Sequence, residues 1–110
     1  MTYRIVITPY AKHQLEMYVA YTATKLKNKQ AAKAIMDDAK VTKERLSNVA
    51  NSLPFCEDET LANYEYRKIL FAKHDFFMIY RIDGNKAIVE AMYHELQDYE
   101  SLFINKTKLK

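Results

Sequence analysis

Residues 64–94 read YEYRKILFAKHDFFMIYRIDGNKAIVEAMYH and contain three runs rich in aromatic and β-branched residues. The runs are 64–71, 76–83 and 86–94, and they are separated by AKHD and by Gly84-Asn85. Aromatic and β-branched residues favour strands, and a two-residue connection that contains glycine favours a tight hairpin turn. The stretch therefore predicts three antiparallel strands in a meander.

Two amphipathic helices are expected before this meander. Apolar residues recur at helical spacing over residues 9–26, where Thr8 and Pro9 suit the N-cap and the first helical position. The same spacing over residues 29–53 predicts a longer helix that follows a break at Asn28. Two helices with so short a joint form a helical hairpin.

Short segments at the two ends complete the predicted domain. Residues 3–8 are expected to form a first strand, and residues 95–104 a short terminal helix. The order is β-α-α-β-β-β-(α), a single α+β domain over residues 1–104 that is followed by a basic tail at 105–110. Because neither long helix is apolar all round, the hairpin should cover one face of a small, antiparallel-rich sheet and leave the other face free.

Composition excludes several classes of protein. The chain has 110 residues, of which 49% are hydrophobic and 28% charged, as in one soluble globular domain. Its single glycine excludes a glycine-rich phosphate loop, and its single cysteine, Cys56, excludes an internal disulfide. No apolar run is long enough for a signal peptide or a membrane span, so we expect a cytoplasmic protein without a membrane partner. The net charge of +3 permits nucleic-acid binding but does not require it.

No metal or cofactor is expected. His13, His74 and His94 lie in three different elements and lack the spacing of zinc ligands. The acidic pair at residues 37–38 and the acidic run at 57–59 show no spacing suited to acid/base chemistry. We interpret both as solvated surface.

Polar side chains on the predicted strands are the candidate functional residues. With alternating side chains, Arg67, Arg81 and His94 can converge on the uncovered face of the sheet, with Tyr99 of the terminal helix nearby. Such a group suits metal-free cleavage of RNA, because histidine can transfer protons and arginine can bind the phosphate.

The alternative is a purely structural role for the same residues. The two strand arginines can pair across strands with Glu65, Asp83 or Glu90. The histidine can simply end its strand. Spacing alone leaves both interpretations open.

The order of the elements, together with residues 64–100, resembles the RelE/ParE superfamily of type II toxin–antitoxin toxins. The most specific parts are the YRK that opens the second strand, the hairpin IYRID–turn–AIVEAMYH, and the H-x₃-DY ending. The resemblance covers nearly the whole chain, and it implies a compact toxin that is neutralised by a co-expressed antitoxin wrapped around its helices and sheet. RelE-like members cleave mRNA on the ribosome, whereas ParE-like members poison DNA gyrase.

On this resemblance we interpret the protein as a toxin that inhibits translation by ribosome-dependent cleavage of mRNA. His94 would serve in proton transfer, and Arg67 and Arg81 would stabilise the phosphate. Lys68 would assist electrostatically, and Tyr99 would orient or stack the nucleotide.

Two positions depart from the ribonuclease members. Phe77 stands where many of them have an arginine early in the middle strand, and Glu95 stands where several have an arginine after the histidine. The alternatives are a ParE-like gyrase poison without an active site of its own, and a toxin-like module that has lost both activities.

Overall fold

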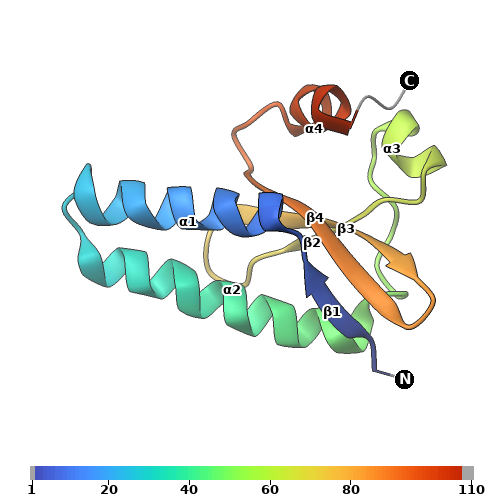
Figure 1. Ribbon diagram of the computed structural model, residues 1–110, viewed down its shortest axis with the longest axis horizontal. Helices are drawn as coiled ribbons and strands as arrows, with labels where there is room; N and C mark the ends of the chain where they lie inside the picture. Colours follow the sequence, from blue (N-terminus) through green and yellow to red (C-terminus); the bar gives the residue numbers. More distant parts are fainter. Residues whose placement is uncertain (1, 108–110) are drawn as a thin grey trace.

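An open four-stranded sheet lies at the centre of the molecule, which a computed structural model describes for residues 2–107 (Figure 1). The strands lie in the order β1-β4-β3-β2, with β1 parallel to β4 and the other neighbours antiparallel. The elements along the chain are β1 (Arg4–Ile7), α1 (Pro9–Thr24), α2 (Lys29–Val49), α3 (Glu59–Asn63), β2 (Arg67–Leu70), β3 (Phe76–Asp83), β4 (Lys86–His94) and α4 (Tyr99–Thr107). The predicted α+β class and element order are confirmed, with α3 as an addition.

The two long helices begin where the sequence predicts. The Thr8 hydroxyl accepts a hydrogen bond from the backbone N–H of Ala11 at 3.2 Å, and Pro9 is the first helical residue. The Asn28 side chain accepts from the N–H of Ala31 at 2.9 Å. Each cap satisfies an N–H group that the first helical turn leaves without a partner.

Helix α2 ends at Val49, four residues before the predicted end. Tertiary hydrogen bonds take the backbone carbonyls that follow: the Tyr80 hydroxyl donates to the carbonyl of Ala50 at 2.6 Å, and the Arg67 guanidinium donates to that of Leu53. Carbonyls at a helix end have no partner within the helix. These long-range donors therefore stabilise the turn after α2.

The segment before β2 is helical where a loop and a longer strand were expected. The Asp58 carboxylate caps α3 by accepting from the N–H of Leu61 at 3.1 Å. Glu65 then adopts a left-handed conformation with φ +62°, and β2 starts only at Arg67. An aspartate at the N-cap favours the start of a helix. The strand is therefore shorter than predicted, because α3 and the turn after it occupy the residues before Arg67.

A β-bulge divides the β3–β4 hairpin. Ile79 pairs with Ala91 whereas Tyr80 pairs with Val89, so Glu90 is an extra residue on β4. A bulge of this kind reverses the alternation of side chains beyond it. Residues 91–94 therefore face the opposite side from the one that uninterrupted alternation predicts.

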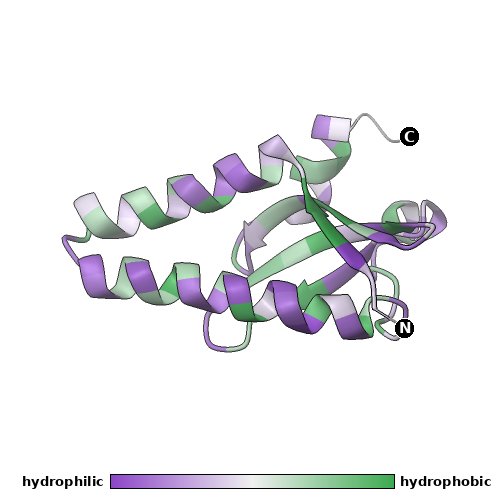
Figure 2. Ribbon diagram, turned by 60° about the horizontal axis from the view of Figure 1, so that its bottom comes forward, coloured by the Kyte–Doolittle hydropathy of each residue, from purple (hydrophilic) through white to green (hydrophobic). Residues whose placement is uncertain are grey.

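Both faces of the sheet are covered, so the expectation of a free face is wrong (Figure 1). The α1–α2 hairpin packs on one face over the first hydrophobic cluster. Helix α4, with α3 beside it, covers the other face. The second cluster lies there: Cys56, Leu61, Tyr66, Phe77, Ile79, Ala91, Tyr93, Tyr99 and Phe103. In Figure 2 the central part of the sheet is mainly hydrophobic, whereas α2 carries many hydrophilic bands.

The C-terminal helix is longer than predicted, and the helical hairpin extends past the sheet. Helix α4 continues to Thr107, so the first three residues of the expected basic tail are helical, and residues 108–110 lie outside the described part. The connection between α1 and α2 projects beyond the sheet (Figure 1), in a molecule of 40 × 32 × 21 Å. Among the helices of residues 2–107, none combines the length and the apolar character needed to cross a membrane.

Candidate functional site

The five predicted site residues lie in three separate places. Arg67 and Arg81 lie at the end of the sheet where β2 begins. Lys68 and Tyr99 meet under α4 on the face away from the hairpin. His94 lies at the other end of β4, next to α1. The structure therefore brings two pairs of the predicted residues together, but not the whole set.

Arg67 binds the turn that follows α2. Its Nη1 donates to the carbonyl of Leu53 and, at 3.5 Å, to that of Asn51. Its guanidinium carbon lies 4.4 Å from the centre of the Phe55 ring, a distance typical of a cation–π contact. The helix dipole also favours a cation at this end of α2. Arg67 is thus placed as a cap for the helix.

Arg81 forms the cross-strand ion pair that the structural alternative predicts. Its Nε donates to Glu90 at 2.8 Å, and this carboxylate raises the pKa of the guanidinium. Arg81 is opposite Ile88 in the hairpin, and Glu90 lies two residues further along β4, on the same face. The contact uses Nε and not the two terminal nitrogens.

The two arginines line one polar hollow of about 220 Å³ at the end of the sheet. Phe55 and Tyr64 also line it, and their side chains are 41% and 51% exposed. Glu65, whose φ is positive, adds a carboxylate to the same wall. This hollow combines cations, exposed aromatic rings and an acid.

Lys68 and Tyr99 meet inside the second hydrophobic cluster. The Lys68 Nζ lies 4.8 Å from the ring centre of Phe77 and 5.1 Å from that of Tyr99. Tyr99 is only 9% exposed and stacks edge-on against Phe77, with ring centres 4.9 Å apart. Burial, with Cys56 and Glu100 close by, raises the pKa of the Tyr99 hydroxyl, so this group keeps its proton at neutral pH.

His94 lies against the helical hairpin. Its Nδ1 accepts the N–H of Leu96 at 3.1 Å, and its ring meets Phe76 edge-on, with the centres 5.0 Å apart. A hollow of about 460 Å³ adjoins it, lined in part by Tyr18 and Gln97. The Tyr18 hydroxyl donates to the Gln97 side chain at 2.7 Å, which fixes that wall. Because Nδ1 accepts a hydrogen bond, a neutral His94 carries its proton on Nε2.

Pairing in the hairpin shows how far His94 lies from the arginines. His94 pairs with Phe76 at one end of β3, whereas Arg81 lies five residues along that strand. At ~3.4 Å per residue this is about 17 Å along the sheet, and the two side chains point to opposite faces. Arg67 pairs with Tyr80, so it also lies at the far end. The expected convergence of Arg67, Arg81 and His94 does not occur.

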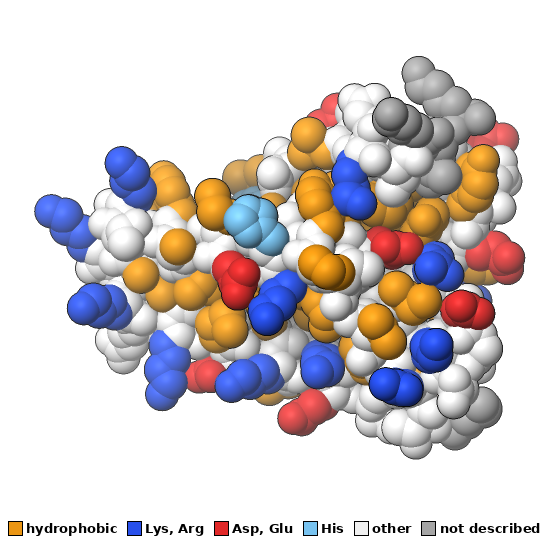
Figure 3. All heavy atoms as spheres, in the orientation of Figure 1, with side chains coloured by type: hydrophobic (Ala, Val, Ile, Leu, Met, Phe, Trp, Pro, Cys, Tyr) orange, Lys and Arg blue, Asp and Glu red, His pale blue; other side chains and the backbone are white. Residues whose placement is uncertain are grey.

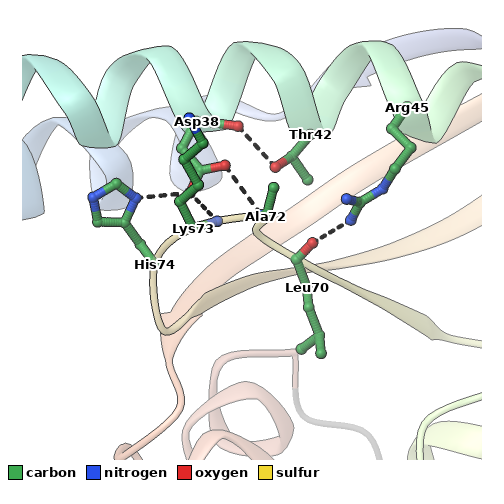
Figure 4. A network of polar contacts seen from close by, with 7 residues as sticks. All are labelled: Asp38, Thr42, Arg45, Leu70, Ala72, Lys73 and His74. Atoms are coloured by element: carbon green, nitrogen blue, oxygen red, sulfur yellow. Dashed lines mark hydrogen bonds and ion pairs between the residues drawn. The ribbon is translucent and has the colours of Figure 1, made fainter.

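A polar network missed by the sequence analysis surrounds Asp38 (Figure 4). Its carboxylate accepts from the N–H groups of Ala72 and Lys73 at 3.0 and 2.8 Å and contacts the His74 Nδ1 at 2.7 Å. Asp38 is only 4% exposed, so its interpretation as solvated surface is wrong. The burial of Asp38 could have been predicted from its position next to Ala39, on the stripe of α2 residues that helical spacing turns toward the core.

The His, Cys, Asp and Glu side chains of residues 2–107 form neither a cluster suited to a metal ion nor an activated thiol. In this range, no three His, Cys, Asp or Glu side chains gather closely enough to hold a metal ion. Burial raises the pKa of the Cys56 thiol to about 11, although Lys68 acts in the opposite direction. A thiol with so high a pKa is a poor nucleophile at neutral pH.

The architecture defines a class of fold: an open sheet with a helical hairpin on one face and a C-terminal helix on the other. No protein-family model matches the sequence. No curated protein matches it either. Among solved structures, a chain from the chromosomal ParDE TA system of P. aeruginosa is similar, with a TM-score of 0.67. The two chains are 18% identical, and the match covers 84% of this chain and 96% of that one. This likeness establishes a shared ParE-like fold.

Proposed function

We propose that the protein is the toxin of a type II toxin–antitoxin pair and that it acts as a ParE-like poison of DNA gyrase. The ParE-like fold and the resemblance of residues 64–100 to the RelE/ParE superfamily support the first part. The wide separation of His94 from Arg67 and Arg81 is the observation that supports gyrase poisoning over cleavage of RNA.

Cleavage of RNA without a metal needs proton-transfer groups and phosphate-binding cations around one phosphodiester. Here the histidine lies about 14–17 Å along the sheet from either arginine, at ~3.4 Å per residue. The arginines are also engaged, Arg67 with backbone carbonyls and Arg81 with Glu90. This arrangement favours a protein that acts by binding its target.

Exposed apolar side chains favour a protein target. At the projecting end of the hairpin, Tyr21 and Leu26 are 57% and 59% exposed, and Met17, further back on α1, is 58% exposed. Large hydrophobic side chains that gather on a surface are typical of protein interfaces. We assign the contact with gyrase to this end of the hairpin, the hairpin tip.

Ribosome-dependent cleavage of mRNA is the second candidate, and one observation favours it. Arg67 and Arg81 share the polar hollow with two exposed aromatic rings, and such a combination can hold a phosphate and a stacked base. In this candidate His94, Lys68 and Tyr99 keep the roles that the resemblance implies.

A supercoiling assay tests the gyrase proposal. Purified protein is added to DNA gyrase, relaxed plasmid and ATP. We expect loss of supercoiling and accumulation of cleaved plasmid. The double variant Tyr21→Ser/Leu26→Ser should lose at least about tenfold in potency, because each change removes an apolar contact of about 1–2 kcal/mol. Ala20→Ser, an exposed change on the same helix, is the matched control.

A translation extract programmed with a defined mRNA tests the second candidate. Under the gyrase proposal the mRNA stays intact. Ribosome-dependent cuts that disappear in His94→Ala and in Arg81→Ala, together with unimpaired gyrase, would overturn the proposal in favour of the ribonuclease.

A further inference from the structure

The polar hollow at the end of the sheet combines groups that one small ligand can use together. Its lining offers the guanidinium groups of Arg67 and Arg81, the exposed rings of Phe55 and Tyr64, and the carboxylate of Glu65. At about 220 Å³ the hollow is smaller than the ~300–1,000 Å³ typical of sites for drug-sized ligands. It therefore suits one compact ligand that leaves part of itself in solvent.

Arg81 offers unused hydrogen-bond donors to this hollow. Its Nε donates to Glu90 at 2.8 Å, which orients the plane of the guanidinium group. The two terminal nitrogens make no hydrogen bond within residues 2–107, and the side chain is 39% exposed. A guanidinium group with this edge free can bind a phosphate through two parallel hydrogen bonds. Arg81 is thus an oriented cation that is ready for an anionic group.

The aromatic side of the hollow is held in place by neighbouring backbone. Phe55 pairs with Arg67 in an isolated antiparallel bridge, so it lies beside the start of β2. The guanidinium carbon of Arg67 lies 4.4 Å from the centre of the Phe55 ring, and the ring is still partly exposed. Tyr64 adds a second exposed ring to the lining. Exposed rings of this kind stack on the flat face of a nucleobase.

Glu65 narrows the choice of ligand. Its backbone is left-handed, with φ +62°, a conformation that is disfavoured for a residue with a Cβ. Strained residues are concentrated at functional sites, where the position of the side chain matters. The carboxylate also repels a phosphate that comes close to it. The hollow therefore favours a ligand that has hydrogen-bond donors at one end and an anionic group at the other.

The balance of charge distinguishes the hollow from other basic parts of the surface. Figure 3 shows blue Lys and Arg side chains spread along α2, whereas blue and red side chains lie close together at the right-hand end, below α4. The hollow itself has two cations and one acid among its six lining residues. Positive charge alone is common on this protein, but its combination with an acid and exposed rings is the special feature of this hollow.

We propose that the polar hollow binds a guanine mononucleotide. Guanine is the only common base that places two adjacent donors, N1–H and the 2-amino group, opposite the two oxygens of a carboxylate. Glu65 accepts both hydrogen bonds, and the terminal nitrogens of Arg81 hold the 5′-phosphate. The base stacks on an exposed ring of the lining. The hollow contains no residue of the hairpin tip, so this site does not depend on the gyrase proposal.

A guanine within a nucleic acid presents the same edge, so RNA or DNA is the competing source of the ligand. The small volume and the carboxylate of Glu65 argue against it, because a longer chain brings additional phosphates close to an acid. The acidic run at residues 57–59, which lies between Phe55 and Tyr64 in the chain, adds to this repulsion. A free mononucleotide fits the hollow better.

Calorimetric titration of the full chain with four ligands tests the chemistry. Guanosine 5′-monophosphate should bind at least about tenfold more tightly than adenosine 5′-monophosphate, since adenine leaves the carboxylate without its two donors. Inosine 5′-monophosphate lacks the 2-amino group and should bind about five- to tenfold more weakly than the guanine nucleotide. Guanosine lacks the phosphate and should bind about tenfold more weakly or worse.

Variants test the two assigned contacts. Glu65→Gln should abolish the preference for guanine over adenine, because an amide has one acceptor oxygen in place of two. Glu59→Gln, an exposed change on α3 outside the lining, should leave this preference within about twofold. Arg81→Gln should weaken binding of the guanine nucleotide by about tenfold and that of guanosine by less than about twofold. Arg4→Gln, an exposed change on β1, is its control, and thermal melting checks that all four variants fold.

Amide NMR during the titration locates the site. Signals of residues 64–67 and 81–82 should shift, and those of residues 21–26 at the hairpin tip should stay in place. The inference is overturned by a dissociation constant above about 1 mM for the guanine nucleotide, by equal affinity for the guanine and adenine nucleotides, or by shifts at the hairpin tip instead. A guanine-containing RNA oligonucleotide that binds at least about tenfold more tightly than the mononucleotide would overturn it in favour of a nucleic-acid site.

Discussion

Asp38 stabilises the connection between β2 and β3 from the middle of α2. One carboxylate receives two backbone N–H groups and the His74 ring, so a single buried side chain ties a long helix to a loop. Burial by itself would raise the pKa of Asp38. The hydrogen bonds outweigh this effect and hold the pKa below its ordinary value of 3.8.

Asp38→Asn should lower the free energy of unfolding by about 2–4 kcal/mol at pH 7, since charge-assisted bonds are lost and an amide faces N–H donors. A carboxylate with a lowered pKa in the fold contributes its full stability above 3.8 and loses it as the pH falls below that value. Urea unfolding from pH 7 to pH 3 should therefore show a steeper loss in the unmodified protein than in the variant. Asp37→Asn, on an exposed neighbour, is the control.

Tyr93 presents the opposite case, a buried hydroxyl that makes no hydrogen bond of good geometry in the described part of the chain. The side chain is 1% exposed, and its hydroxyl makes no hydrogen bond of good geometry within residues 2–107, although the Tyr10 and Gln14 side chains lie near it. Burial, with Tyr10 nearby, raises the pKa of this hydroxyl. A buried hydroxyl without a hydrogen bond costs about 1–3 kcal/mol.

Tyr93→Phe should therefore leave the protein as stable as before or more stable, by up to about 1 kcal/mol, because the ring is kept and the unpaired hydroxyl is removed. Urea unfolding at pH 7 measures the change. A loss of more than about 1 kcal/mol would contradict it and would indicate a hydrogen bond that the hydroxyl makes in solution.

At the scale of elements, a strained residue lies just beyond the end of α3. Glu65 has φ +62°, and its N–H donates to the carbonyl of Ala62 at 2.9 Å, while that of Tyr66 donates to Leu61 at 3.0 Å. This is the arrangement in which helices commonly place glycine just beyond their end. A side chain with a Cβ is disfavoured there.

Glu65→Gly should raise the free energy of unfolding by about 0.5–1 kcal/mol, since glycine adopts this conformation without strain. Thermal melting measures the change. Glu65→Ala removes the same carboxylate and keeps the strained backbone, so it should not be stabilised. Equal gains in both variants would assign the effect to charge instead of backbone conformation.

Helix α4 is the element that closes the second face. Phe103 is fully buried there and meets Tyr66 edge-on, with ring centres 5.0 Å apart. Phe103→Ala should lower the free energy of unfolding by about 3–5 kcal/mol, as for other large-to-small changes in a core. A change of less than ~1 kcal/mol in urea unfolding would show that α4 detaches from the sheet in solution. Leu102→Ala, at a residue that is 45% exposed, is the control.

At the scale of the whole molecule, the proposed function predicts which variants remain toxic. His94→Gln should still arrest growth in cells, because a binding poison needs no proton transfer. The hairpin-tip variant Tyr21→Ser/Leu26→Ser should relieve the arrest. Colony counts with a readout of DNA damage measure both effects. Loss of toxicity in His94→Gln alone, without DNA damage, would favour the ribonuclease.

Local signals made much of the fold predictable. Helical spacing, the caps Thr8 and Asn28, and the turn at Gly84 (φ +63°) depend on neighbours in the chain, and each predicted element was confirmed in type. The acidic cap of α3 is a local signal too, but a short helix beside a strand-like run is easily missed.

The placement of the candidate site was not predictable in this way. The extra residue, Glu90, arises from the way β3 and β4 pair and not from the local sequence of either strand. It places His94 on the face opposite Arg81. Arg67 is drawn to the end of α2 by carbonyls at residues 51 and 53, which are distant in sequence.

The amino-acid sequence by itself therefore determined the class of fold, the order of the elements and the chemical types of the candidate residues, because these follow from local periodicity and composition. Only the tertiary structure decided which of those residues meet, which face α4 covers, and that Glu65 joins the two arginines in one hollow. The physical reason is that side-chain direction in a sheet depends on register. One unpaired residue is enough to reverse it.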